Sequence, residues 1–166
     1  EAREFLADGF ADALVDEEDM ALQPVLIKAI LAGQLGGDLG PQPVSVSVAL
    51  HESVDSTSTS LYGLFTLPLE GERLLGGHAM CVVGYIDGAD PDGLYDTDYF
   101  IVRNSWGREW AKSNPLDLPG YALIPTAYLT RHKLLWEAYV CLAETSPASS
   151  LGLLRWLRLV WELEEA

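Results

Sequence analysis

Apolar and polar residues alternate strictly along residues 44–50, which is the two-residue period of a strand with one buried face. This period places Val44, Val46 and Val48 on that face. Runs of β-branched and aromatic residues between Gly, Asp and Pro predict two further strands at 76–85 and 99–107, joined as a hairpin by the acidic loop 86–98. Shorter apolar runs predict strands at 121–124 and 134–142 and an extended or edge segment at 61–69. We expect Trp136 to lie in the core.

Helical spacing is clearest at residues 24–32, where Pro24 falls in the first turn and Gly33 follows the last apolar residue. Residues 1–15 show a weaker helical stripe, which is interrupted by Gly9. The acids at 16–19 are expected to form a solvated turn or to begin the next helix, whose N-terminal dipole favours them. Residues 53–60 are rich in Ser and Thr and predict an exposed loop. Helices and strands in this order predict an α+β fold.

The end of the chain predicts a separate helix. Residues 143–150 form a Pro/Ser-rich linker, and residues 151–166 form a helix that is apolar around most of its circumference. Such a helix has to pack on its own domain, on a partner protein or at a membrane surface. In the second case Leu154, Trp156 and Trp161 would be the partner-binding residues, because aromatic side chains dominate buried interfaces. The chain thus divides into a helical and acidic segment (1–20), a main domain (21–142), the linker and this helix.

Charge and spacing exclude several classes of ligand. With 10 Lys and Arg against 25 Asp and Glu, the net charge of −15 repels phosphate backbones, so no nucleic-acid partner is expected. The acidic runs lack the ligand spacing of a calcium loop, and no metal or other cofactor is predicted. No stretch of about 20 apolar residues is present to span a bilayer. The two cysteines do not mark an oxidising compartment.

The predicted hairpin brings a histidine to an asparagine. If its strands pair symmetrically about the loop, residues whose numbers sum to about 182 face each other, so His78 faces Asn104. The amide oxygen of Asn104 could then accept the proton on one ring nitrogen, which fixes the tautomer and aims the other nitrogen at a group that must lose a proton. Cys-His-Asn catalysis uses this arrangement.

Three motifs in order carry a resemblance: GGHAMCVVGY at 76–85, FIVRNSWG at 100–107 and GYALIP at 120–125. Together they resemble the C-terminal half of a papain-like cysteine peptidase over roughly residues 24–141. The resemblance implies a barrel-like right-hand domain with N-terminal helices, to which the C-terminal amphipathic helix is added. It also implies a peptide substrate, with His78 as catalytic base, Asn104 as its orienting partner and Trp106 as the indole that shields their hydrogen bond. Ala111, where the family commonly has Gly, departs from the pattern.

Small residues beside the histidine, Gly76, Gly77 and Ala79, would leave room for a substrate backbone. The family's nucleophilic Cys, in a Cys-Gly-[Ser/Ala]-Cys-Trp-like context, and its oxyanion-stabilising Gln precede the His, and this chain contains neither. Cys81 lies three positions from His78 and so points to the opposite face of the strand.

We expect Cys81 and Cys141 to be buried core thiols, with a disulfide between them left open. Two hypotheses follow. The chain is an accessory or interaction module docked through its terminal helix, or it is the His/Asn half of a peptidase. In the second case the Cys is supplied by an upstream segment, as a start at Glu1 would suggest, or by another chain. Each hypothesis implies a protein partner or a second chain.

Overall fold

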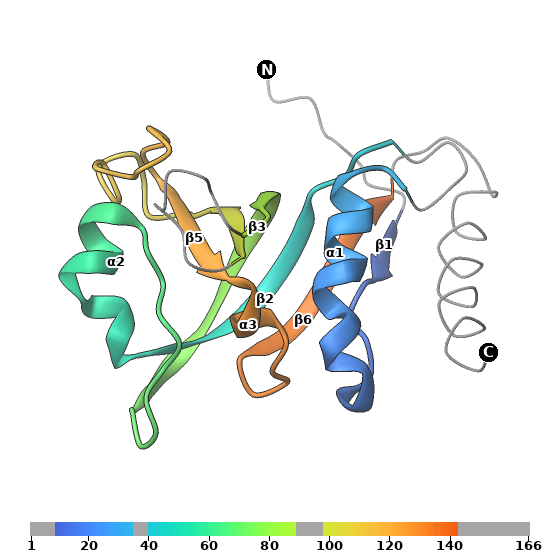
Figure 1. The fold of residues 1–166 in the computed structure, drawn as a ribbon, viewed down its shortest axis with the longest axis horizontal. Helices are drawn as coiled ribbons and strands as arrows, with labels where there is room; N and C mark the ends of the chain where they lie inside the picture. The colour runs from blue at the N-terminus through green and yellow to red at the C-terminus, as the bar shows by residue number, and fades with distance from the viewer. Residues whose placement is uncertain (1–8, 35–39, 89–97, 143–166) are drawn as a thin grey trace.

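The computed structural model describes residues 9–34, 40–88 and 98–142, and its six strands form one antiparallel sheet in the order β1-β6-β2-β3-β4-β5 (Figure 1). The α+β class is confirmed. The strands are β1 (Gly9–Asp12), β2 (Val44–His51), β3 (Leu74–Ile86), β4 (Tyr99–Arg103), β5 (Tyr121–Pro125) and β6 (Leu135–Leu142).

The core lies on one face of this sheet. Val44, Val46 and Val48 of β2 are buried, as their alternation predicts, and their register carries the same face onto Met80 and Val82 of β3. Helix α1 (Gln23–Leu31) lies against the sheet in front of β2 and β6 (Figure 1). Six of its nine residues are buried, and Val25, Lys28 and Leu31 form the outer stripe at three-residue spacing, because a helix packed on a sheet buries one side.

The N-terminal segment differs from the prediction. Residues 9–12 form strand β1, paired with β6 from Gly9↔Leu142 to Asp12↔Tyr139, instead of a helix. Gly9 disfavours a helix, and pairing satisfies backbone groups along the otherwise open edge of β6, so tertiary context prevails over the weak stripe. The acids that follow lie in the first turn of the short 3₁₀ helix η1 (Glu17–Leu22), which agrees with the expectation that they begin a helix. The fully buried Gln23 side chain ties this segment down, donating to the Ala13 carbonyl at 2.8 Å and accepting from the Val15 amide at 2.9 Å.

The Ser/Thr-rich stretch is helical, so the predicted loop is wrong. It contains the 3₁₀ helix η2 (Glu52–Asp55) and helix α2 (Thr57–Tyr62). The Ser56 hydroxyl caps α2 by accepting the backbone N–H of Thr59, and the left-handed Gly63 (φ +71°) ends it. Thr59 is fully buried and donates to the Leu64 carbonyl at 2.9 Å.

The remaining elements lie close to their predicted positions. Leu61 and Tyr62 of the predicted extended segment belong to α2, Leu64 forms an isolated bridge to Leu123 of β5, and residues 66–69 run on without joining the sheet. Helix α3 (Thr126–Leu129) follows β5 directly. Trp136 is 40% exposed, so its predicted place in the core is wrong; β6 shifts register against β2 between Ser47 and Val48, which turns this residue outward. The predicted C-terminal helix and the whole predicted linker lie outside the described residues, and the four-part division of the chain stays a prediction.

Candidate active site

The central hairpin forms with a register different from the predicted one. Cys81 pairs with Arg103 and Val82 with Val102, and after the extra residue Val83 the pairing resumes at Gly84↔Ile101. Strand β4 ends at Arg103, so Asn104 lies just beyond the ladder and does not pair with His78 across it. Compared with the symmetric register, the pairing is offset by three residues beside the loop and by two residues beyond the β-bulge at Val83, so the symmetric register is wrong.

The predicted contact between His78 and Asn104 is nevertheless made. The His78 Nε2 atom lies 2.8 Å from the Asn104 Oδ1 atom. Strand β3 positions the histidine opposite Val48, on the core face at one end of the sheet. The backbone N–H of Asn104 donates to the Gly120 carbonyl at 3.1 Å, which holds the asparagine against the start of β5. Because an amide oxygen only accepts, the proton of a neutral His78 ring sits on Nε2, and Nδ1 is the basic nitrogen.

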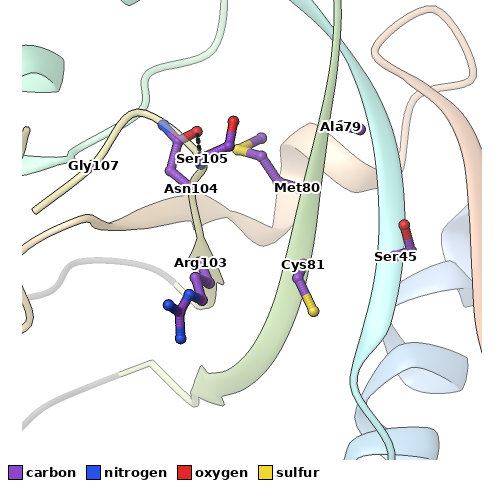
Figure 2. Close-up of a pocket in the computed structure, with 8 residues that line it drawn as sticks. All are labelled: Ser45, Ala79, Met80, Cys81, Arg103, Asn104, Ser105 and Gly107. Carbon is purple, nitrogen blue, oxygen red and sulfur yellow. Dashed lines mark hydrogen bonds between the residues drawn. The ribbon is translucent and has the colours of Figure 1, made fainter. Parts of the chain in front are cut away.

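A second hydrogen bond fixes the orientation of the asparagine amide. The Asn104 Oδ1 atom also accepts the backbone N–H of Ser105 at 2.8 Å, the contact drawn as a dashed line in Figure 2. A flipped amide would turn its NH₂ group toward that N–H, so only one orientation satisfies both donors. The side chain is 8% exposed, and its Nδ2 has no partner among the described residues.

An indole covers one side of the imidazole. The rings of Trp106 and His78 stack with centroids 4.7 Å apart and planes inclined by 30°. The Trp110 ring contacts the Trp106 ring edge-on, with their centroids 5.1 Å apart. Trp106 is 42% exposed, so its outer surface faces solvent. This stack reduces the access of water to the His78 ring from one side.

The three small residues beside the histidine lie on two different faces. Gly76 lies two positions before His78 and so faces the same side of β3, and an added Cβ there would meet no atom within 4 Å. Gly77 and Ala79 are exposed on the opposite face of β3. The Trp136 ring occupies the space beside Gly77, since a Cβ at that position would lie 2.4 Å from a ring carbon. The sequence gives no signal for this contact, because it joins strands that are not neighbours in the sheet.

Cys81 also lies on the face turned away from His78. It pairs with Ser45 in β2, whereas His78 pairs with Val48, so the two side chains project from opposite sides of the sheet. Its side chain is half-buried, which corrects the expectation of a buried core thiol. With Ser45, Ala79 and Arg103 it lines a shallow hollow of about 480 Å³ (Figure 2). The Cys141 side chain and the predicted partner-binding residues Leu154, Trp156 and Trp161 lie outside the described part of the chain.

Other kinds of site have no support in the part of the chain that the structure describes. Within residues 9–34, 40–88 and 98–142, no three His, Cys, Asp or Glu side chains converge as metal ligands. No helix among these residues has the length and apolar character to cross a membrane.

Comparison with known proteins relates this site to one group. Residues 35–118 match the model of the papain family cysteine proteases. The chain is 29% identical over 105 residues to an uncharacterized peptidase C1-like protein of Acanthamoeba polyphaga mimivirus, which covers 63% of this chain and 29% of that protein. It is 41% identical over 71 residues to cathepsin L of Sarcophaga peregrina, covering 42% of this chain and 18% of that enzyme.

A solved structure shows the same fold. The crystal structure of xylellain, a cysteine protease from Xylella fastidiosa, aligns with 82% of this chain and 40% of its own, with a TM-score of 0.52 and 22% identity. The chain therefore spans under a third of the two curated relatives and under half of this structure. A family match across half of the sequence, centred on the hairpin that holds His78, shows that the chain belongs to the papain family of cysteine proteases.

Proposed function

We propose that this chain provides the histidine and asparagine of a cysteine peptidase active site, and that the thiol comes from outside these 166 residues. The observation that carries the proposal is the 2.8 Å contact between His78 Nε2 and Asn104 Oδ1, which leaves Nδ1 as the basic nitrogen. His78 is then the general base and Asn104 its positioning residue.

The mechanism is acyl transfer through a thioester. His78 Nδ1 takes the proton of the thiol, and the thiolate attacks the carbonyl carbon of a peptide bond. The imidazolium returns that proton to the leaving amine, which departs as the thioester remains. Water, deprotonated by the same nitrogen, then releases the acid product. While the ring is charged its Nε2–H still donates to Asn104, and the stacked Trp106 ring limits competition from water for that hydrogen bond.

Cys81 does not serve as this nucleophile. Its Cβ projects from the opposite face of β3, and no bulge interrupts the ladder between His78 and Cys81 to bring the two side chains together. Attack by a thiol assisted by His78 requires the sulfur within hydrogen-bond reach of the ring. The proposed peptide hydrolysis therefore needs a further cysteine, other than Cys81 and Cys141.

A second candidate function is that of an interaction module built on the same fold. The observation that favours it is a set of large apolar side chains exposed on β3 and on the segments around it. Leu74 and Leu75 in β3, Trp106 in the loop after β4, and Trp136, whose ring lies beside Gly77 on the face opposite His78, are each 40–50% exposed. Apolar surface of this kind commonly marks a protein interface. Both candidates require a further segment or a partner chain, and they differ in whether it brings a thiol.

Isolation of the protein from its source, with every covalently joined or co-purifying segment, tests the two candidates. The preparation is treated with an epoxysuccinyl probe directed at activated thiols, and the labelled residue is identified by mass spectrometry. We expect labelling at a cysteine other than Cys81 and Cys141. In the same system, His78→Ala should slow labelling at neutral pH by at least about 100-fold, the usual contribution of a general base.

The matched control is His132→Ala. His132 is an exposed histidine paired with Glu17 at 3.1 Å, and its loss should leave labelling unchanged. Asn104→Ala should reduce the rate less than His78→Ala does, because the base remains but its orientation is lost. A preparation with its partners bound in which no thiol reacts would contradict the peptidase and favour the interaction module.

A further inference from the structure

A second hollow lies behind the loop that carries Asn104. It has a volume of about 410 Å³ and is enclosed by the segment that connects β4 to β5. Arg103 and Arg108 contribute its positive charge, Asp117 its single carboxylate, and Tyr121 an aromatic wall. We call this hollow the arginine pocket.

The two arginines are uncompensated. Within the described residues, Arg73 pairs with Glu52, and Lys28 pairs with two aspartates, but neither Arg103 nor Arg108 makes an ion pair. The other cations without an ion pair in the described residues, Lys112, Arg131 and Lys133, do not line this pocket. Their charge is available to a ligand.

The walls of the pocket are held in place before any ligand binds. The Arg103 guanidinium lies over the Tyr121 ring, 5.9 Å from its centroid, which limits its motion. The buried Asn114 side chain braces the loop, donating to the carbonyls of Tyr62 and Tyr121 and accepting the N–H of Leu116 at 2.9 Å. A braced loop loses little conformational entropy on binding.

We propose that the arginine pocket binds a carboxylate group of an acidic peptide. Guanidinium groups bind carboxylates through paired, charge-assisted hydrogen bonds. The two guanidinium groups and the Asp117 carboxylate leave the pocket a net charge of about +1, which one carboxylate neutralises. The Asp117 carboxylate also provides an acceptor for a backbone N–H of the same peptide, which a free anion lacks.

The pocket adjoins the candidate active site but does not depend on it. Asn104 and Gly107 line it from the side of the loop that carries Trp106. Arg103 points away from the Asn104 side chain and reaches the outer face beside Cys81, as Figure 2 shows. Binding there requires no thiol, so this proposal stands or fails separately from the proposed peptidase activity.

The test is a titration of the full ¹⁵N-labelled chain with the peptide acetyl-Gly-Asp-Glu-Gly-amide at low salt, followed by NMR. We expect saturable shifts at the side-chain Nε–H of Arg103 and Arg108 and at the backbone amides of residues 107–120. Arg103→Gln and Arg108→Gln should each weaken binding about fivefold to tenfold, whereas Arg131→Gln, an exposed arginine outside the pocket, should not change it. Asp117→Asn should strengthen binding about threefold, a gain that a purely structural role would not produce.

Three controls can overturn the proposal. The neutral peptide acetyl-Gly-Asn-Gln-Gly-amide should produce no saturable shift, and equal binding by it would refute recognition of a carboxylate. Inorganic phosphate that bound the pocket more tightly than the peptide would assign the site to a free anion instead. Unchanged affinity in both pocket variants, with their spectra showing an intact fold, would place the peptide elsewhere.

Discussion

Replacement of Tyr128 by Phe should lower the free energy of unfolding at pH 7 and leave it almost unchanged at pH 11. Tyr128 in α3 is 2% exposed, and its hydroxyl donates to the Ala49 carbonyl of β2 at 2.5 Å. Burial, with a smaller effect from the charge of Glu72, raises the pKa of Tyr128 to about 12. In the unfolded chain the same phenol has its ordinary pKa of about 10.

The sign and size follow from proton linkage. Between about pH 10 and pH 12 the unfolded chain loses the Tyr128 proton while the native chain keeps it, so the stability contributed by the neutral phenol is full below pH 10 and declines above it. The loss reaches about 1.4 kcal/mol at pH 11 and about 3 kcal/mol above pH 12. At pH 7 the phenylalanine variant should be less stable by about 1–2 kcal/mol, because it lacks the hydrogen bond to Ala49. The difference should therefore fall close to zero by pH 11.

Urea unfolding of both proteins at pH 7, 9, 10 and 11, followed by tryptophan fluorescence, measures this difference. Effects of other titrating groups are common to both proteins and cancel. Tyr62→Phe is the matched control, since Tyr62 is 42% exposed and its replacement should change the free energy of unfolding little. A Tyr128→Phe penalty that stayed equal at pH 7 and pH 11 would show that the phenol is not held neutral by burial.

Three further changes test the fold around the site. Gly63→Ala should destabilise the chain by about 3 kcal/mol in urea unfolding, because φ is +71° and the new Cβ would lie 2.4 Å from a backbone oxygen of β5; a loss under 1 kcal/mol would contradict this. Gly77→Ala should cost less than about 1 kcal/mol and shift the tryptophan emission, since the ring it meets is exposed and can move. Asp98→Asn should cost under about 1 kcal/mol at pH 7, and the cost should shrink below pH 4. The Gly88 N–H and the Lys28 ammonium lower the pKa of Asp98 in the folded chain. The stability that the Asp98 carboxylate contributes is therefore present above the pKa of the unfolded chain and is lost as the pH falls through the folded pKa. An Asp98→Asn penalty that stayed unchanged at pH 3 would exclude this contribution.

Helices and strands could be predicted from the sequence where their hydrophobic period, or a Pro or Gly at their ends, is a local feature. Strand β2 follows from its alternation, and α1 from Pro24 and the glycine after it. The contact between His78 and Asn104 was also predictable, but for a reason that needed correction. The pairing is offset from the symmetric register by two to three residues, and the loop beyond β4 brings Asn104 to the imidazole instead.

Features that depend on distant partners could not be predicted. The helix α2 requires Thr59 to be buried, and nothing in a Ser/Thr-rich stretch signals that its hydroxyl will find the Leu64 carbonyl. The strand β1 exists because β6 offers an open edge. The arginine pocket likewise depends on the loop held by Asn114, whose hydrogen bonds reach 52 residues back to Tyr62.

The pairing of β1 with β6 determines how far a segment attached before β1 or after β6 has to extend to come to His78. Because Gly9 lies opposite Leu142, chain arriving before β1 and chain leaving after β6 share one corner of the sheet. From β1 to the strand of His78 there are three inter-strand steps, about 14 Å across the sheet, and Leu142 lies seven residues, about 23 Å, beyond Leu135, which is level with Val48 and His78. About eight extended residues cover the combined distance of about 27 Å. A tether at either end can therefore be short, and a short tether holds whatever it carries at high effective concentration next to the imidazole.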